Sequence, residues 1–274
     1  MQIPLTKPIL RPFREGIASN QILRAIVLPL LRRIDRPITI TNPFSGLPFH
    51  LLSYTHKGYW FYGKHREADT MGRLSRLTRS GDTVFEVGGH IGYLTQFFAK
   101  KVGQKGQIHV FEPGQENQRF LRKNIARCTQ CVHINAAVSN HSGKAMFYEE
   151  NMGGFMNSLE ADFAATSDIA DNQRNALQIR ARRVNTVTLD AYALAHNVWP
   201  DVLKIDVEGA ELAVLRGAGQ VLENVRSLMI EVTRNHHQVF EILDDHEFTL
   251  TQPDGTPITD PSDMQGNVFA TRTV

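Results

Sequence analysis

The chain has 274 residues, a formal net charge of +2, 42% hydrophobic residues and 21% charged residues. These proportions are those of an ordinary globular protein and exclude a mainly disordered chain. The length provides for one α/β domain of about 200 residues and an extension.

Basic residues concentrate near the start of the chain. Residues 1–80 hold thirteen Lys and Arg against four Asp and Glu, and the remainder holds seventeen against twenty-four. Such asymmetry indicates either a segment that meets an acidic surface or two parts of one molecule that attract each other. Clustered lysines with interleaved aromatic platforms are missing from the sequence, so it predicts no nucleic-acid partner.

Residues 17–34 form the first predicted helix. Its apolar run, residues 25–31, is far shorter than the roughly twenty residues that cross a bilayer. An arginine-rich stretch follows it where a signal peptide would have a small-residue cleavage site. We interpret residues 1–58 as a basic N-terminal extension whose helix packs on its own domain, with peripheral contact to a membrane or a protein as the alternative. The expected location is cytoplasmic.

Short strands or loops are predicted over residues 37–50, and a further strand over residues 50–56. The aromatic cluster Tyr59–Tyr62 is more typical of a core than of a substrate pocket, although both interpretations stay open. Apolar residues at helical spacing predict a helix over residues 67–79, which a Ser-Gly-Asp sequence ends.

Residues 82–95 organise the rest of the chain. β-forming residues 83–87 predict a buried strand, and Gly88, Gly89 and Gly92 then permit a sharp turn and close approach of a ligand. Glu112 ends the next apolar strand about twenty residues beyond the turn, which is the spacing of a carboxylate that binds ribose hydroxyls. The two elements together predict a cofactor that contains a nucleoside.

The residues of the turn favour S-adenosylmethionine over NAD(P). His90 occupies the position where a dinucleotide site needs its middle glycine to admit pyrophosphate. Glu86, two residues before the first glycine, would repel a phosphate and attract an ammonium group. S-adenosylmethionine carries an adenosine, an amino group and a sulfonium, and it has no phosphate.

The elements that follow alternate between helix and strand: helix 92–101, strand 107–111, helix 115–126 and strand 132–138. Such alternation predicts a parallel sheet with right-handed crossovers. Ala136 belongs to a small-residue stretch that either leaves room for an adenine ring or merely eases packing. Strands over 145–150 and 178–183 flank an insertion, which is typical of a lid or a binding loop.

The only two cysteines, Cys128 and Cys131, form a Cys-x-x-Cys sequence. No second pair completes a zinc site, and nothing indicates a fold built on disulfides. We interpret the pair as incidental, with a redox couple or a partial metal site as alternatives.

Three acidic residues surround the end of the fourth predicted strand, which begins at residue 201. Asp206 and Glu208 lie where open α/β sheets bind ligands, whereas Glu211 also suits the first turn of the following helix. A fifth strand is predicted over 227–232, and His236 and His237 then open a helix at the same edge. These histidines are either candidate bases or exposed capping residues. Strands over 248–252 and 267–274 close the sheet as an antiparallel pair.

Over residues 59–245 the chain resembles the FkbM family of S-adenosylmethionine-dependent methyltransferases. The resemblance is carried by residues 85–93, 110–113 with Asn117, 135–139, 187–190, and above all Leu-Lys-Ile-Asp-Val-Glu-Gly-Ala-Glu at 203–211 with 215–218. The family usually has Asp, Gly-Ala and Asn where this chain has Glu86, Gly88-Gly89 and His90. Glutamate keeps the charge, whereas histidine changes the geometry around the cofactor.

The resemblance implies a class I methyltransferase domain over residues 59–274, with a Rossmann-like, mostly parallel sheet and an antiparallel last strand. Glu86, Gly88 and Gly92 would hold the methionine end of the cofactor, Glu112 the ribose, and Asp206 would lie near the methyl group. The full set assigned to the cofactor comprises Glu86, Gly88, Gly89, His90, Gly92, Tyr93, Glu112, Pro113, Asn117, Ala136 and Asp206.

Family members commonly methylate hydroxyls of sugars and other natural products, so the resemblance implies a small-molecule acceptor. Asp206 or Glu208, and after them His236 or His237, are the candidate bases for the acceptor hydroxyl. Alternatively, Asp206 and Glu208 could hold a divalent metal that binds vicinal hydroxyls. Two other functions stay open. One is a non-catalytic or membrane-associated binding module on the same scaffold. The other, less favoured, is an NAD(P)-dependent oxidoreductase.

Overall fold

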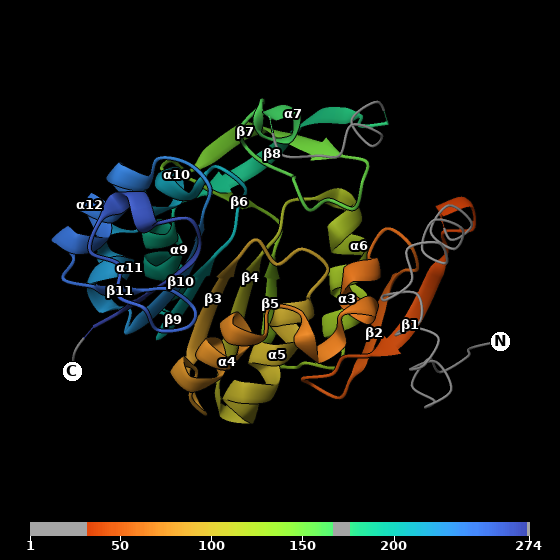
Figure 1. The fold of residues 1–274 in the computed structure, drawn as a ribbon, viewed down its shortest axis with the longest axis horizontal. Coiled ribbons are helices and arrows are strands. Elements are labelled where there is room, and N and C mark those ends of the chain that lie inside the picture. Colours follow the sequence, from red (N-terminus) through yellow and green to blue (C-terminus); the bar gives the residue numbers. More distant parts are fainter. Residues whose placement is uncertain (1–31, 167–175, 273–274) are drawn as a thin grey trace.

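The structure is a computed structural model that describes residues 32–166 and 176–272 (Figure 1). The helix predicted over 17–34 therefore lies almost entirely outside the described residues. Within these ranges no helix is long and apolar enough to cross a membrane.

A seven-stranded sheet forms the centre of the molecule (Figure 1). Its order is β11 (Thr249–Thr251), β12 (Gly266–Thr271), β10 (Ser227–Val232), β9 (Val202–Ile205), β3 (Thr83–Val87), β4 (Gln107–Phe111) and β5 (Cys131–Ile134). The five strands from β10 to β5 run parallel, whereas β12 is antiparallel to both of its neighbours. The predicted parallel sheet with an antiparallel last strand is confirmed. The chain reverses its direction of winding between β3 and β9, which creates a crevice at their carboxyl ends.

Two layers of helices cover the sheet: α4 (Ala68–Leu77), α5 (Tyr93–Val102) and α6 (Gln115–Ile125) on one face, and α9 (Leu189–His196), α10 (Glu211–Arg216), α11 (Gly219–Asn224) and α12 (His236–Asp245) on the other. Successive residues of β3 alternate between the layers, since Val84 packs against the first and Phe85 against the second. Because both faces are covered, the buried residues of the strand are apolar, except for Glu86. Short 3-10 turns lie at Gly63–His65 (η1), Gly103–Lys105 (η2) and Pro261–Asp263 (η3).

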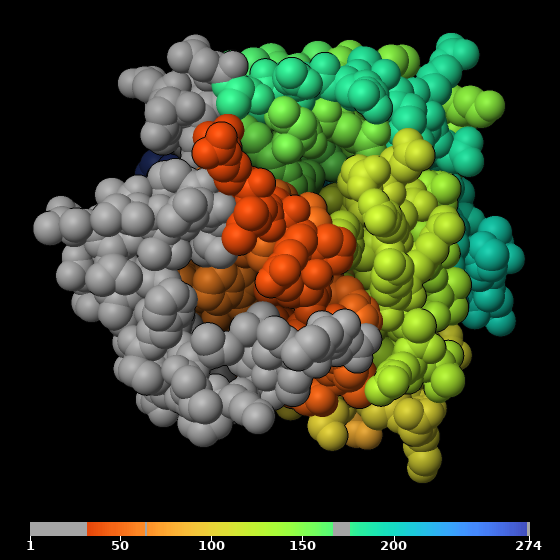
Figure 2. Space-filling view, turned by 90° about the vertical axis from the view of Figure 1, so that its right-hand side faces the viewer, coloured from red at the N-terminus to blue at the C-terminus, as the bar shows by residue number. Residues whose placement is uncertain are grey.

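A hairpin precedes the central sheet: β1 (Pro37–Thr41) and β2 (Pro48–Leu52), followed by α3 (Lys57–Phe61). The strand expected near residues 50–56 ends at Leu52, and the aromatic cluster begins within α3. Phe49 and Leu51 share a buried cluster with Tyr59 and Phe120. The hairpin consequently packs beside α6 (Figures 1 and 2). Residues 37–58 thus share a core with the domain, and the division of the chain at residue 58 stays a prediction.

A second sheet has the order β6 (Ala137–Val138), β8 (Ile179–Val187) and β7 (Gly143–Glu150), with the short helix α7 (Phe163–Thr166) between β7 and β8. The strand predicted over 132–138 is therefore wrong in part. It breaks after Ile134, and Ala137 and Val138 pair with β8 instead of continuing beside β4. The next helix begins at Leu189, because the Thr188 side chain accepts a hydrogen bond from the Ala191 N–H and caps it.

Candidate cofactor and active site

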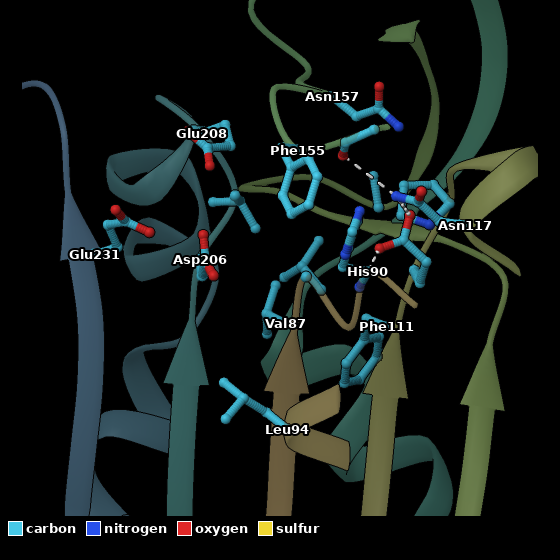
Figure 3. A pocket seen from close by; sticks show the side chains of 18 of the residues that line it. Val87, His90, Leu94, Phe111, Asn117, Phe155, Asn157, Asp206, Glu208 and Glu231 are labelled. Carbon is cyan, nitrogen blue, oxygen red and sulfur yellow. Dashed lines mark hydrogen bonds between the residues drawn. The ribbon is translucent and has the colours of Figure 1, made fainter. Parts of the chain in front are cut away.

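A cavity of about 250 Å³ opens at the carboxyl ends of β3, β4 and β9 (Figure 3). A smaller cavity of about 60 Å³ beside it shares several lining residues, Gly88, His90 and Asp206 among them. The predicted cofactor residues that line the main cavity are Gly88, His90, Glu112, Pro113, Asn117, Ala136 and Asp206. The smaller cavity adds Glu86, Gly89 and Tyr93. Gly92 lines neither cavity.

The glycines of the turn are needed for packing between protein segments. Gly88 has φ +80°, and a Cβ there would overlap the backbone carbonyl oxygen of Asp206 at the end of β9. A Cβ on Gly92, at φ +86°, would lie 2.8 Å from Leu121 Cδ1. The predicted tight turn is confirmed, but the space that these glycines leave open is filled by the neighbouring strand and α6.

Replacing Gly88 by Ala should therefore destabilise the protein much more than replacing Gly81. Both glycines have positive φ, and nothing lies within 4 Å of a Cβ at Gly81. Gly81→Ala should cost about 1 kcal/mol in free energy of unfolding from backbone strain alone. Gly88→Ala adds overlap with a backbone atom and should cost about 3 kcal/mol or more. Urea denaturation of both variants checks this; equal losses would contradict it.

Glu112 is held by hydrogen bonds from three sides. One carboxylate oxygen accepts from the His90 backbone N–H (2.7 Å), and the other accepts from the Gly114 N–H (2.7 Å) and Asn117 Nδ2 (3.3 Å). Burial raises the pKa of Glu112 to about 7, although these hydrogen bonds oppose the rise. The carboxyl group therefore has one fixed position in the cavity wall, as binding of a ribose would require.

His90 joins the glycine turn to the insertion that follows β7. Its Nε2 lies 2.7 Å from the Gly153 carbonyl oxygen, so Nε2 must carry the proton, and Nδ1 accepts from the Tyr59 hydroxyl at 2.9 Å. The Phe155 ring packs on the imidazole at 4.4 Å between centroids. Burial lowers the pKa of His90 to about 3, which keeps the ring neutral. Residues 151–158 thus form a roof over the cavity (Figure 3).

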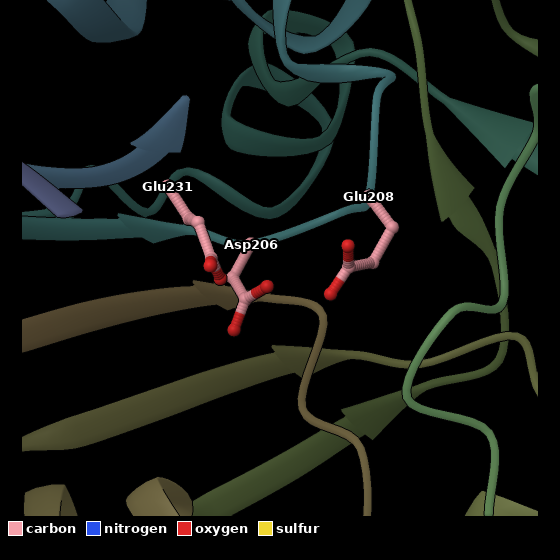
Figure 4. A group of neighbouring side chains, drawn as sticks. All are labelled: Asp206, Glu208 and Glu231. Carbon is pink, nitrogen blue, oxygen red and sulfur yellow. The ribbon is translucent and has the colours of Figure 1, made fainter. Parts of the chain in front are cut away.

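Three carboxyl groups meet on the β9 side of the cavity: Asp206, Glu208 and Glu231. One oxygen of each lies within 4.8 Å of the others (Figure 4). The Lys204 ammonium lies 3.2 Å from Asp206 Oδ2 and donates to the Gly88 carbonyl at 2.6 Å. We call Asp206, Glu208 and Glu231 together the acidic group; Lys204 is the buried cation beside it.

The three carboxyl groups differ in their affinity for protons. Burial alone would raise the pKa of Asp206, but the Lys204 charge and a hydrogen bond to Glu231 lower it. Burial, and next to it the Asp206 charge, raise the pKa of Glu208 to about 8. The nearby Asp206 charge, followed by burial, raises the pKa of Glu231 to about 9. At neutral pH Asp206 is thus ionised, whereas Glu208 and Glu231 are mostly protonated.

The remaining predicted candidates lie outside the cavity. Glu211 is buried, and its Oε1 accepts from the Gly209 N–H (2.8 Å) and the Thr233 hydroxyl (3.1 Å), so it stabilises the start of α10. His236 and His237 begin α12 and line neither cavity. The geometry therefore gives these histidines no contact with the site.

Sequence reasoning missed three cavity residues: Arg66, Glu67 and Glu231. Phe155 and Asn157 lie in the insertion that the sequence predicted as a lid or a binding loop, and both line the cavity. Glu231 left one signal, a charged residue inside the apolar strand Ser227–Val232. Tyr59 has both of its proposed roles, because it belongs to a buried cluster and lines the cavity.

The acidic group has the oxygen ligands that a hard divalent cation prefers. Lys204 already supplies positive charge to Asp206, however, and the raised pKa of Glu231 means that this group retains a proton. We therefore expect any reaction at this site to be independent of metal. Dialysis against EDTA should leave the initial rate unchanged, with or without added Mg²⁺. A rate that falls with EDTA and returns with Mg²⁺ would support the metal alternative.

The strand order and the cavity at the switch in winding define a class I methyltransferase fold. Residues 86–252 match the model of the methyltransferase FkbM domain. The chain belongs to this family, so the resemblance found in the sequence is confirmed.

A curated relative is the hexuronic acid methyltransferase AglP of Haloferax volcanii, 25% identical over 169 residues. The match covers 61% of this chain and 62% of that protein. The crystal structure of methyltransferase FkbM from Methylobacillus flagellatus KT matches with a TM-score of 0.43 and 12% identity, over 91% of this chain and 59% of that one. Fibrillarin of Aeropyrum pernix with natively bound S-adenosyl-L-methionine matches with a TM-score of 0.42 and 14% identity, over 86% and 82%.

Proposed function

We propose that the protein is an S-adenosylmethionine-dependent O-methyltransferase that acts on a hydroxyl of a sugar or a similar natural product. The observation that carries the proposal is the division of one cavity into an adenosine-like half and an acidic half. Membership of the FkbM family supports the choice of cofactor.

The adenosine-like half lies along the ends of β4 and β6. Phe111, Pro113 and Ala136 supply an apolar lining that suits an adenine ring, and Glu112 supplies the carboxylate for the ribose hydroxyls. Lys204, the cation nearest to the glycine turn, is already bound to Gly88 and Asp206. This half therefore favours a nucleoside without phosphate over a dinucleotide.

The acidic half would receive the reacting groups. S-adenosylmethionine supplies a methyl group on a positively charged sulfur. Asp206 remains ionised beside Lys204 and would attract that positive charge. Glu208 would accept the proton of the acceptor hydroxyl, because a general base works best when its pKa is near the working pH. Alignment of the reactants contributes roughly 7–11 kcal/mol in such reactions, and a base contributes about 10²–10⁴ in rate.

The acidic group also bears on the acceptor. Asp206, which stays ionised near the point of transfer, disfavours a carboxylate acceptor beside it and favours a neutral hydroxyl. The name of AglP as a hexuronic acid methyltransferase supports a sugar as the acceptor. We predict that the acceptor is a small molecule and not a nucleic acid. We also predict a cytoplasmic location.

Titration calorimetry with S-adenosylmethionine, S-adenosylhomocysteine, NAD⁺ and NADP⁺ tests the choice of cofactor. Binding of the first two and no binding of the dinucleotides is expected. Binding of a dinucleotide alone would favour an oxidoreductase.

Incubation with methyl-labelled cofactor and a panel of glycosides and hexuronic acids tests the reaction. We expect the label in a product that withstands mild alkali, because methyl ethers are stable there and methyl esters hydrolyse. An alkali-labile product would mean transfer to a carboxyl group instead. Cofactor binding without transfer to the panel or to a cell extract would favour the non-catalytic alternative.

A further inference from the structure

Arg66 brings a guanidinium group to the edge of both cavities. It lies between η1 and α4 and lines the main cavity and the smaller one. Its side chain is only 28% exposed, and its guanidinium carbon lies 4.8 Å from the centre of the Tyr59 ring. An arginine that stacks on an aromatic face keeps its hydrogen-bonding plane fixed.

The charges around the smaller cavity leave Arg66 available to a ligand. The lining includes the acids Glu67, Glu86 and Asp206 and the cations Arg66 and Lys204. Lys204 is 2% exposed and bound to Asp206 and the Gly88 carbonyl. Arg66 pairs with Glu67 at 3.0 Å, but that partner is 41% exposed and can turn into water. Among the described residues that line the cavities, Arg66 is therefore the cation that an anionic ligand group can reach most readily.

We propose that Arg66 binds the α-carboxylate of the amino-acid end of S-adenosylmethionine, an inference that rests on the proposed function. That cofactor has one negative group, and its two positive groups suit the acidic half near Asp206. With the adenosine directed toward Glu112, the amino-acid end is directed toward the smaller cavity, whose lining includes Gly88 and Arg66. A guanidinium can bind a carboxylate through two parallel hydrogen bonds.

The proposal makes the segment around residues 59–67 part of the cofactor site. Tyr59 orients both Arg66 and His90, through ring stacking and a hydrogen bond respectively. A nucleoside that lacks the amino acid would bind without help from Arg66. This difference provides a test that separates charge recognition from a general effect on the fold.

The test compares two ligands on three variants. S-adenosylhomocysteine contains the amino acid, whereas 5′-methylthioadenosine contains the adenosine and lacks it. Arg66→Ala should weaken binding of S-adenosylhomocysteine by about 10- to 100-fold, which is the range for a lost hydrogen bond to a charged group. Binding of 5′-methylthioadenosine should change less than about twofold. Arg66→Lys should restore part of the affinity because it keeps the charge.

Arg76→Ala is the matched control. Arg76 lies on the exposed side of α4 and lines neither cavity, and its replacement removes the same charge from the same segment. It should leave both affinities unchanged.

Three results would overturn the proposal: no loss for either ligand with Arg66→Ala, an equal loss for both, or an equal loss with Arg76→Ala. Retained binding of 5′-methylthioadenosine certifies that the Arg66→Ala protein is folded. Failure of the wild-type protein to bind S-adenosylmethionine and S-adenosylhomocysteine would refute the proposed function itself, and that result is distinct from failure of the role of Arg66.

Discussion

Glu208→Gln should lower kcat by about 10²–10⁴ and leave the affinity for S-adenosylmethionine nearly unchanged. Glu208 lines the acidic half of the cavity beside Asp206, and its raised pKa of about 8 favours uptake of a proton from the acceptor. Glutamine has nearly the same size and cannot accept the proton of the acceptor. The loss should therefore appear in turnover, measured at saturating cofactor.

The pH dependence of the wild-type enzyme follows from the same assignment. Burial and the charge of Asp206 raise the pKa of Glu208, so at low pH the group is protonated and cannot act as a base. The value of kcat/KM should fall about tenfold per pH unit below pH 8 and level off above it. The residual activity of Glu208→Gln should lack this dependence.

His237→Gln is the control for this prediction. His237 is exposed in the first turn of α12 and lines neither cavity, so its replacement should leave kcat unchanged. Normal turnover in Glu208→Gln, or a large loss in His237→Gln, would show that the base has been assigned to the wrong element.

Glu112→Ala should raise the Kd for S-adenosylmethionine by about 100-fold or more. The change removes the acceptor for the ribose and also leaves the buried N–H groups of His90 and Gly114 without a partner. Each orphaned donor costs about 1–3 kcal/mol, so the free energy of unfolding should fall as well. Calorimetric titration and urea denaturation measure the two effects separately.

Glu116→Ala distinguishes this effect from a general loss of negative charge near α6. Glu116 lies in the first turn of the same helix, and its side chain is 82% exposed. Its replacement should change neither Kd nor stability appreciably. Unchanged cofactor affinity in Glu112→Ala would contradict the assignment of the adenosine-like half.

The central sheet could be predicted because its signals are local. The bounds of β3, β4 and β10 coincide with the predicted strands, since each is an apolar run that ends in polar residues or glycine. Helices α5 and α6 begin close to their predicted starts for the same reason. Alternation of such elements leaves few arrangements other than a parallel sheet.

Elements that depend on distant partners were predicted less well. Residues 132–138 have the composition of one strand, but Ala137 and Val138 pair with Thr186 and Val187 in a different sheet. The choice between β4 and β8 as partner depends on a segment about fifty residues away, and no local pattern encodes it.

The sequence by itself determined the fold class, the family and the residues at the strand ends, Glu112, Asp206 and Glu208. Carboxyl ends of parallel strands meet at one edge of a sheet, so their position along the chain suffices to place them. Only the tertiary structure decided the other positions. β10 brings Glu231 beside Asp206. Segments distant in sequence bring Arg66 and Phe155 to the cavity. These contacts arise from packing between separate elements, which the order of residues within any one element does not specify.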